Sequence, residues 1–183
     1  MYNPAEIDDM LGRLEILIDT REQDTELFRK RTEGFKCPFV RQKLDFGDYS
    51  CRTFDNAGNE VNLKSRAAIE RKMNWDELCT CFGHGRARFQ REFERAQAAG
   101  CVLYLLIENA DFEKLYAHKY RSKLTPQSLI ASIFSWSARY NMKILFCRPE
   151  TSGALIHDIL KYEMREYLLN CEEKDNAGTE RVC

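Results

Sequence analysis

Hydrophobic residues along the chain come in short runs separated by polar and turn-forming segments, a pattern that predicts alternating strands and helices. The first apolar run, at residues 14–19, is typical of a buried strand and ends in a carboxylate. The polar, helix-compatible stretch that follows extends to residue 33, and Gly34 stands where a helix would end. We therefore expect the chain to begin with a strand, a short loop and a helix.

A block of strands is predicted next. Residues 37–44 and 46–54 carry alternating and β-prone side chains, and residues 55–59 form a turn sequence before extended character resumes at 60–63. This pattern indicates a β-hairpin. A further run at residues 67–72 predicts another strand.

Capping signals mark two helices after this block. Asn74, with Glu77 three residues later, resembles a capping box, so a helix is expected to begin near Trp75. A second helix is predicted over residues 86–99, where aromatic and small residues recur at helical spacing and Gly100 follows.

The rest of the chain continues the alternation. Residues 101–108 predict a buried strand, a helix is expected to begin at Thr125, residues 143–147 predict a short strand, and residues 152–170 a last helix. This order favours an α/β fold with a mixed sheet flanked by helices. The segment 171–183 lacks apolar periodicity and is expected to be a flexible C-terminal tail.

Length and composition indicate one soluble domain at residues 1–170. A chain of 183 residues with 44% hydrophobic residues is long enough to enclose a core. Its apolar runs are too short to span a membrane, and the N-terminus lacks the basic and apolar regions of a secretory signal. We expect a cytoplasmic protein that is not secreted, and the absence of a lysine-rich nuclear signal favours a bacterial, phage or plasmid origin.

The eight cysteines are interpreted as reduced thiols, because a chain with this much aliphatic and aromatic content does not need a disulfide framework. Cys79, Cys81 and His84 have possible zinc-ligand spacing. They lack a second pair of ligands, so zinc is disfavoured there.

The formal net charge of −1 argues against a protein that coats nucleic acid through a uniformly basic surface. A local basic patch remains open. Residues 84–95 concentrate arginines in a predicted helix, and the alternative for these side chains is a solvated helix face.

The candidate chemistry lies at residues 69–78. On a strand, Glu70 and Lys72 project from one face and Arg71 from the other. A carboxylate binds a hard divalent cation, and a lysine beside it can orient or deprotonate water, or balance phosphate charge. Asp48, after a glycine in the hairpin, would add a second carboxylate. The pair Glu70 and Lys72 alone is a weak signal, because an exposed charge pattern on a strand is common.

Three motifs follow one another along the chain, namely IDTRE at residues 18–22, FGDY at residues 46–49 and ERKMNWD at residues 70–76. Together they resemble the nuclease domain of the XPF/MUS family of structure-specific endonucleases, whose hallmark is GD followed by ERKxxxD. The helix sequence HGRARFQREF and the strand sequence VLYLLIE are similar to the family segments that come next. The resemblance implies a restriction-endonuclease-like fold.

The resemblance implies a role for each residue at a matching position. Asp48 and Glu70 would be the principal ligands of Mg²⁺ or Mn²⁺, with Asp19 lining or completing the site. Lys72 would act on the water or phosphate. The remaining matches are catalytic-site residues expected to hold the geometry, namely Glu22, Arg71 and Asp76, and residues expected to contact DNA, namely Arg21, Arg86 and Arg88.

Two of these positions have simpler interpretations. Arg71 points away from Glu70 on an ideal strand, so it can instead form a salt bridge that supports Asp76 or Glu22. Asp76 can equally be a negative charge at a helix N-terminus, where the helix dipole stabilises it.

The function implied by the resemblance is metal-dependent hydrolysis of DNA phosphodiesters, at branched, flapped or distorted duplexes. The alternatives are an inactive DNA-binding or dimerisation subunit of the same fold, and a restriction or phage recombination nuclease. A homodimer or heterodimer is expected, through the helices from Thr125 onward, where Ile133, Phe134 and Trp136 offer apolar surface or, alternatively, ordinary core. The insert at residues 50–68 is longer than the family's usual connection, and the chain leaves no room for the family's helix-hairpin-helix module.

Overall fold

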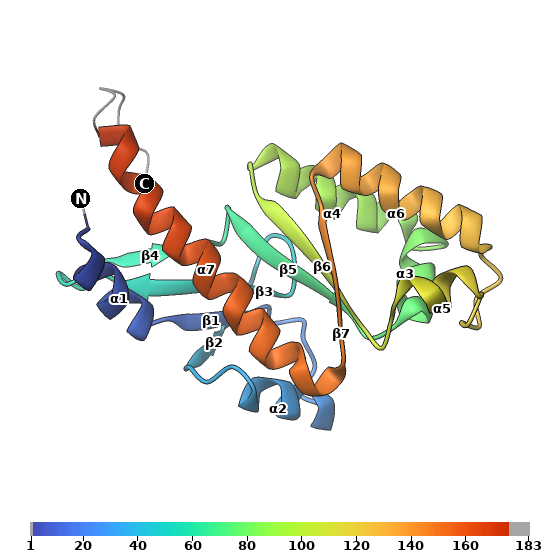
Figure 1. The fold of residues 1–183 in the computed structure, drawn as a ribbon, viewed down its shortest axis with the longest axis horizontal. Coiled ribbons are helices and arrows are strands. Elements are labelled where there is room, and N and C mark those ends of the chain that lie inside the picture. Colours follow the sequence, from blue (N-terminus) through green and yellow to red (C-terminus); the bar gives the residue numbers. More distant parts are fainter. Residues whose placement is uncertain (1, 176–183) are drawn as a thin grey trace.

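A computed structural model of the chain describes residues 2–175 as one twisted sheet between two layers of helices (Figure 1). The strands are β1 (Glu15–Ile18), β2 (Phe39–Arg41), β3 (Tyr49–Phe54), β4 (Glu60–Asn62), β5 (Ala67–Lys72), β6 (Val102–Glu108) and β7 (Lys143–Cys147). The helices are α1 (Pro4–Gly12), α2 (Glu26–Glu33), α3 (Trp75–Phe82), α4 (Arg86–Ala98), α5 (Phe112–Tyr116), α6 (Pro126–Tyr140) and α7 (Pro149–Asp175).

The seven-stranded sheet is mixed, in the order β2-β1-β3-β5-β6-β7, with β4 paired to β3. Strand β1 runs parallel to β2 and antiparallel to β3, and β3 is antiparallel to β5. Strands β5, β6 and β7 are parallel, and helical crossovers connect them. The predicted α/β class, a mixed sheet flanked by helices, is confirmed.

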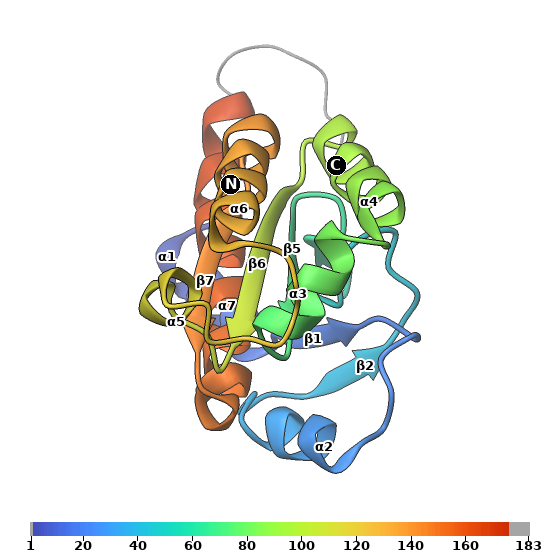
Figure 2. The ribbon, with the colours of Figure 1, turned by 90° about the vertical axis from the view of Figure 1, so that its right-hand side faces the viewer.

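A separate hydrophobic core fills each side of the sheet. Helices α1, α2 and α7 pack on one face, while α3, α4, α5 and α6 cover the other (Figure 2). Strand β6 serves both cores because its side chains alternate: Leu103, Leu105 and Ile107 enter the second, and Tyr104 and Leu106 enter the first. The sheet thereby separates two environments for the residues of the motif ERKMNWD.

Three local features add to the sequence-based expectation. The predicted hairpin around residues 55–59 is confirmed and consists of β3 and β4, whereas the segment at residues 39–41 pairs in parallel with β1. Helix α1 was not predicted, although Asn3 and Glu6 form a complete capping box around Pro4. The short helix α5 was also missed.

The C-terminal helix is longer than predicted. Helix α7 begins at Pro149 and continues past Asn170 to Asp175. The rest of the predicted flexible tail, residues 176–183, lies outside the described residues. Within the described residues, no helix combines the length and apolar character needed to cross a membrane.

The expected dimer surface on α6 is largely core. Ile133 and Trp136 are 0% and 1% exposed, so neither offers apolar surface to a partner. Trp136 instead packs against Phe82, Phe89 and Phe93. Phe134 alone of the three named residues is accessible, at 50%.

Candidate active site

Asp48 lies where β3 and β5 diverge, and it joins three segments of the sheet. Its N–H donates to the carbonyl of Ile69 at 2.8 Å, and its own carbonyl accepts from the N–H of Asp19 at 2.9 Å. Its carboxylate Oδ2 accepts the backbone N–H of Arg71 at 2.8 Å. The Asp48 carboxylate thus accepts a backbone hydrogen bond from β5 that a carbonyl of a neighbouring strand would otherwise accept. This fixes the Asp48 carboxylate beside β5.

Gly47 permits this close approach. Its φ is +71°, a conformation that favours glycine, and a Cβ there would lie 3.0 Å from the Ala68 Cβ. The N–H of Gly47 donates to Glu92 Oε1 on α4 at 2.8 Å. The turn before Asp48 is therefore held against both β5 and α4.

Glu70 and Lys72 project from the same face of β5, toward α3 and α4, as the alternation predicts. Both are nearly buried, at 5% and 7% exposure. The Lys72 ammonium forms an ion pair with Glu70 and lies 5.3 Å from the centre of the Phe89 ring. Glu77 of α3 is 3.9 Å from the same ammonium. The Lys72 ammonium is thus held beside the Glu70 carboxylate in a nearly buried site.

The carboxylates repel each other. Burial raises the pKa of Asp48 well above its usual range, and the negative charge of Glu70 raises it further. Burial also raises the pKa of Glu70, although Lys72 opposes this shift. Burial alone would lower the pKa of Lys72, but Glu70 and Asp48 more than compensate and raise it. Lys72 is therefore a protonated cation at neutral pH, and not a free base.

These residues fit a hard divalent cation. Asp48 and Glu70 supply carboxylate oxygens. Burial, followed by nearby negative charges, raises their pKa values, so a bound cation would stabilise their ionised forms. Within the described part of the chain, no group of three or more His, Cys, Asp or Glu side chains is arranged to hold a metal. Magnesium needs few protein ligands, because it keeps waters and takes substrate phosphate oxygens.

Asp19, which is expected to line or complete the site, hydrogen-bonds with the segments around it in this structure. Its Oδ1 accepts from the backbone N–H and the Nε of Arg21, and its Oδ2 accepts the N–H of Leu44 at 2.7 Å. Burial would raise the pKa of Asp19, but these hydrogen bonds lower it overall. Both oxygens are thus engaged in fixing the segments that flank β1.

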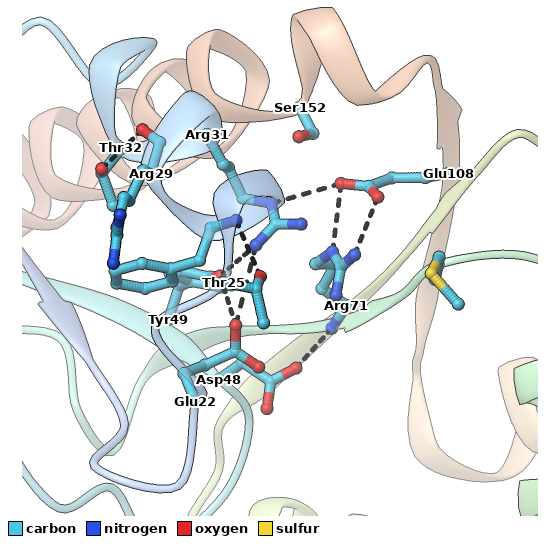
Figure 3. Close-up of polar contacts among 12 residues, drawn as sticks. Glu22, Thr25, Arg29, Arg31, Thr32, Asp48, Tyr49, Arg71, Glu108 and Ser152 are labelled. Carbon is cyan, nitrogen blue, oxygen red and sulfur yellow. Dashed lines mark hydrogen bonds and ion pairs between the residues drawn. The ribbon is translucent and has the colours of Figure 1, made fainter.

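An ionic network occupies the opposite face of the sheet (Figure 3). The Tyr49 hydroxyl donates to Glu22 at 2.9 Å, and Arg31 donates to the Tyr49 hydroxyl at 3.1 Å. Glu108 accepts from Arg31 at 3.2 Å and from Arg71 at 3.0 and 2.9 Å. Through the backbone N–H of Arg71, this network reaches the carboxylate of Asp48.

Arg71 has a different partner from those expected. It points away from Glu70, as predicted, but its guanidinium pairs with Glu108 at the end of β6 and not with Asp76 or Glu22. Glu108 is 1% exposed and forms ion pairs with two arginines, Arg31 and Arg71. Burial would raise the pKa of Glu108, yet Arg71 and Arg31 lower it overall.

Asp76 lies in the first turn of α3, and its carboxylate binds the loop between α5 and α6. Oδ1 accepts the N–H groups of Arg121 and Ser122 at 2.7 and 3.2 Å, and Oδ2 accepts the Nε of Arg121 at 3.1 Å. Asp76 therefore acts on a neighbouring loop in this structure.

The side chains of the three arginines predicted to contact DNA are held by different numbers of contacts. Arg86 donates to Ser132 at 3.1 Å and lies over the ring of Trp136. Arg21 pairs with Asp19 but leaves 53% of its side chain exposed. Arg88 is exposed on α4.

Four residues that the sequence reasoning did not assign lie in the site or in the ionic network beside it: Arg31, Glu77, Glu92 and Glu108. Glu77 was interpreted only as a capping residue, and Glu92 was not assigned a role within the arginine-rich helix. The signal for Glu92 was its helical offset from Phe89, which places both on the side of α4 that faces Gly47 and Lys72.

The mixed sheet, the carboxylates at the divergence of β3 and β5 and the adjacent lysine define a restriction-endonuclease-like nuclease domain of the XPF type. The family model of the ERCC4 domain matches residues 18–159, and the chain belongs to this family. The resemblance and the fold predicted from the motifs are confirmed.

Two solved structures have the same fold. The first is XPF from Aeropyrum pernix, with a TM-score of 0.59 and 16% identity, matching 86% of this chain and 69% of that one. The second is XPF from Aeropyrum pernix in complex with DNA, with a TM-score of 0.60 and 15% identity, matching 84% of this chain and 66% of that one. A comparison with the curated proteins finds no match.

Proposed function

We propose that the chain is a metal-dependent DNA endonuclease that hydrolyses phosphodiester bonds, at branched, flapped or otherwise distorted duplexes. The observation that carries this proposal is the convergence of Asp48, Glu70 and Lys72 on one protected site from separate parts of the chain. The match to the ERCC4 domain and the similarity to an XPF structure in complex with DNA support the choice of substrate.

Asp48 and Glu70 would hold Mg²⁺ or Mn²⁺. The ion, when bound, supplies charge neutralisation and lowers the pKa of an attacking water. Lys72 keeps its proton because Glu70 and Asp48 raise its pKa, so it would offset negative charge on the phosphate and orient the water. The network through Arg71 and Glu108 would keep the Asp48 carboxylate in place during the reaction.

Basic side chains around this site would position the DNA. Arg88 and Arg21 project into solvent, and Arg86 is held by α6 in a fixed orientation. Contacts of this kind bind the phosphate backbone and carry no sequence information. A small site with few side chains that read bases selects DNA by its shape and deformability.

The proposal is tested by offering labelled linear, flap and junction DNAs to the purified protein with Mg²⁺ or Mn²⁺. We expect metal-dependent cleavage of the distorted substrates, and its loss in Asp48→Asn and Lys72→Met. Binding without cleavage would point to the inactive-subunit alternative. Cleavage confined to one sequence in a linear plasmid would point to a restriction-type nuclease.

We further propose that the nuclease acts as a dimer, homomeric or with a related partner. Of the apolar residues expected to form the contact, Phe134 is accessible and stacks on Phe112 with ring centres 5.8 Å apart. Phe134→Ser should shift the protein toward monomer in light scattering. A wild-type protein that is monomeric at working concentration would contradict this proposal.

A further inference from the structure

The loop between α5 and α6 carries a concentration of basic residues. Residues 117–125 contain Lys119, Arg121 and Lys123 and no acidic residue. Lys119 and Lys123 are exposed, and the Arg121 side chain is 88% exposed. We call residues 117–125 the basic loop. In a chain with a formal net charge of −1, such a segment is a local departure toward positive charge.

The basic loop is an ordered structure. The Tyr120 hydroxyl donates to the carbonyl of Leu124 at 2.8 Å, and the N–H of Leu124 donates to the Ser122 hydroxyl at 3.2 Å. A ring nitrogen of His118 lies 3.1 Å from the carbonyl of Ser122. These bonds close the loop on itself, so its lysines project from a defined backbone.

One acidic residue attaches the basic loop to the catalytic side of the molecule. Asp76 accepts two backbone N–H groups and one guanidinium N–H from Arg121 and Ser122. Burial would raise the pKa of Asp76, but these hydrogen bonds lower it, so the carboxylate is ionised at neutral pH. Figure 2 shows the loop running beside α3.

The distance to the active site suits a nucleic acid. Asp76 follows Lys72 by four residues, so their Cα atoms are at most about 14 Å apart. Successive base pairs of duplex DNA rise by about 3.4 Å, so this upper limit corresponds to roughly four base pairs. A duplex that presents a phosphate to Lys72 would therefore bring further phosphates near the loop.

We propose that the basic loop binds the phosphate backbone of a DNA arm next to the cleavage site, and that Asp76 is the residue that holds the loop in the binding position. This inference rests on the proposed nuclease function and adds a second DNA-contacting surface to it. It gives the last residue of the ERKxxxD motif a positioning role in substrate binding, separate from the metal.

The double variant Lys119→Gln/Lys123→Gln tests the charge of the basic loop. Its control is Lys161→Gln/Arg165→Gln on α7, which removes the same amount of charge from the other helical layer. Affinity for labelled flap DNA is measured in EDTA over a range of salt concentrations. We expect the loop variant to lose about tenfold in affinity and to lower the log-log salt slope by about 2. Equal effects of the two variants would overturn the proposal.

The anchoring role makes a prediction of the opposite sign to a simple charge effect. Removing a carboxylate near DNA should strengthen binding through charge alone, whereas releasing the loop should weaken it. We expect Asp76→Ala to weaken binding, and its effect to be less than additive with that of Lys119→Gln/Lys123→Gln. Asp76→Asn keeps an oxygen for the two backbone N–H groups and should retain most of the affinity.

Tighter or unchanged binding by Asp76→Ala would overturn the anchoring role, provided that thermal unfolding shows a folded protein. These results are distinguishable from failure of the nuclease proposal. A wild-type protein that binds no DNA contradicts the proposed function itself. A wild-type protein that binds and cleaves DNA while the loop variant matches the α7 variant contradicts only the role of the loop.

Discussion

The two carboxylate oxygens of Glu108 each accept a hydrogen bond from the guanidinium of Arg71, at 3.0 and 2.9 Å, and Oε1 also accepts one from Arg31 at 3.2 Å. Neutralising such a buried carboxylate leaves two arginine charges without a partner. We expect Glu108→Gln to lower the free energy of unfolding by about 3 kcal/mol at neutral pH. Urea denaturation measures this change.

The matched control is Glu163→Gln, which removes the ion pair of Glu163 with Lys143 on the same face of the sheet. Their side chains are 26% and 48% exposed, so this loss should stay below about 1 kcal/mol. Equal destabilisation by the two variants would show that burial of the Glu108 network adds nothing.

The same network predicts a dependence of stability on pH. The pKa of Glu108 is lowered in the folded protein, because Arg71 and Arg31 outweigh the effect of burial. Its ionised form therefore stabilises the fold at pH values above the unfolded pKa of glutamate, about 4.3, and this stabilisation disappears as pH falls through the folded pKa. The stability difference between wild type and Glu108→Gln should shrink in acid. A difference that stays constant from neutral pH to about pH 3 would refute this account.

Lys72 is predicted to act through its charge. Burial would lower its pKa, but Glu70 and Asp48 raise it, so the ammonium persists at neutral pH. Lys72→Met should reduce kcat by about 100-fold or more, because a fixed positive charge is lost from a protected site. It should also increase the stabilisation by Mn²⁺ in thermal unfolding, since Lys72 no longer competes for Glu70. Unchanged stabilisation by Mn²⁺ would place the ion elsewhere.

Local features of the site were predictable from the sequence for a physical reason. Side chains alternate along any strand, so the shared face of Glu70 and Lys72 and the opposite direction of Arg71 followed once β5 was recognised. The glycine before Asp48 was likewise a local signal, because a positive φ favours glycine.

The partners of these residues were not predictable in the same way. Arg31 and Glu108 are 77 positions apart, and their contact depends on how α2 packs on the sheet. No periodicity in either segment encodes that pairing. The hydrogen bond of Asp19 to Leu44 was not predictable for a similar reason, since it depends on the parallel pairing of β1 with β2.

A side chain at Gly47 should destabilise the protein. A Cβ would lie 3.0 Å from the Ala68 Cβ and 3.1 Å from the Ile69 carbonyl oxygen, at a φ of +71°. We expect Gly47→Ala to cost about 2 kcal/mol of stability, from backbone strain and the contact together. Gly58→Ala is the control, because its φ is +84° with nothing within 4 Å, so only about 1 kcal/mol of strain applies. Similar losses in the two variants would argue against the close approach to β5.

The ionised Asp48 carboxylate is predicted to lower the stability of the folded protein, although cleavage requires it. Burial and the charge of Glu70 raise its pKa in the folded protein, so its ionised form opposes folding at pH values above that folded pKa. The penalty vanishes below the unfolded pKa of aspartate, about 3.9. Asp48→Asn removes the charge and keeps an oxygen for the N–H of Arg71. It should raise the free energy of unfolding by about 1 kcal/mol at neutral pH without metal, while cleavage and stabilisation by Mn²⁺ are lost. Asp45→Asn, an exposed neighbour, should change none of these quantities. A destabilised Asp48→Asn variant at neutral pH would show that the carboxylates do not repel each other as the structure indicates.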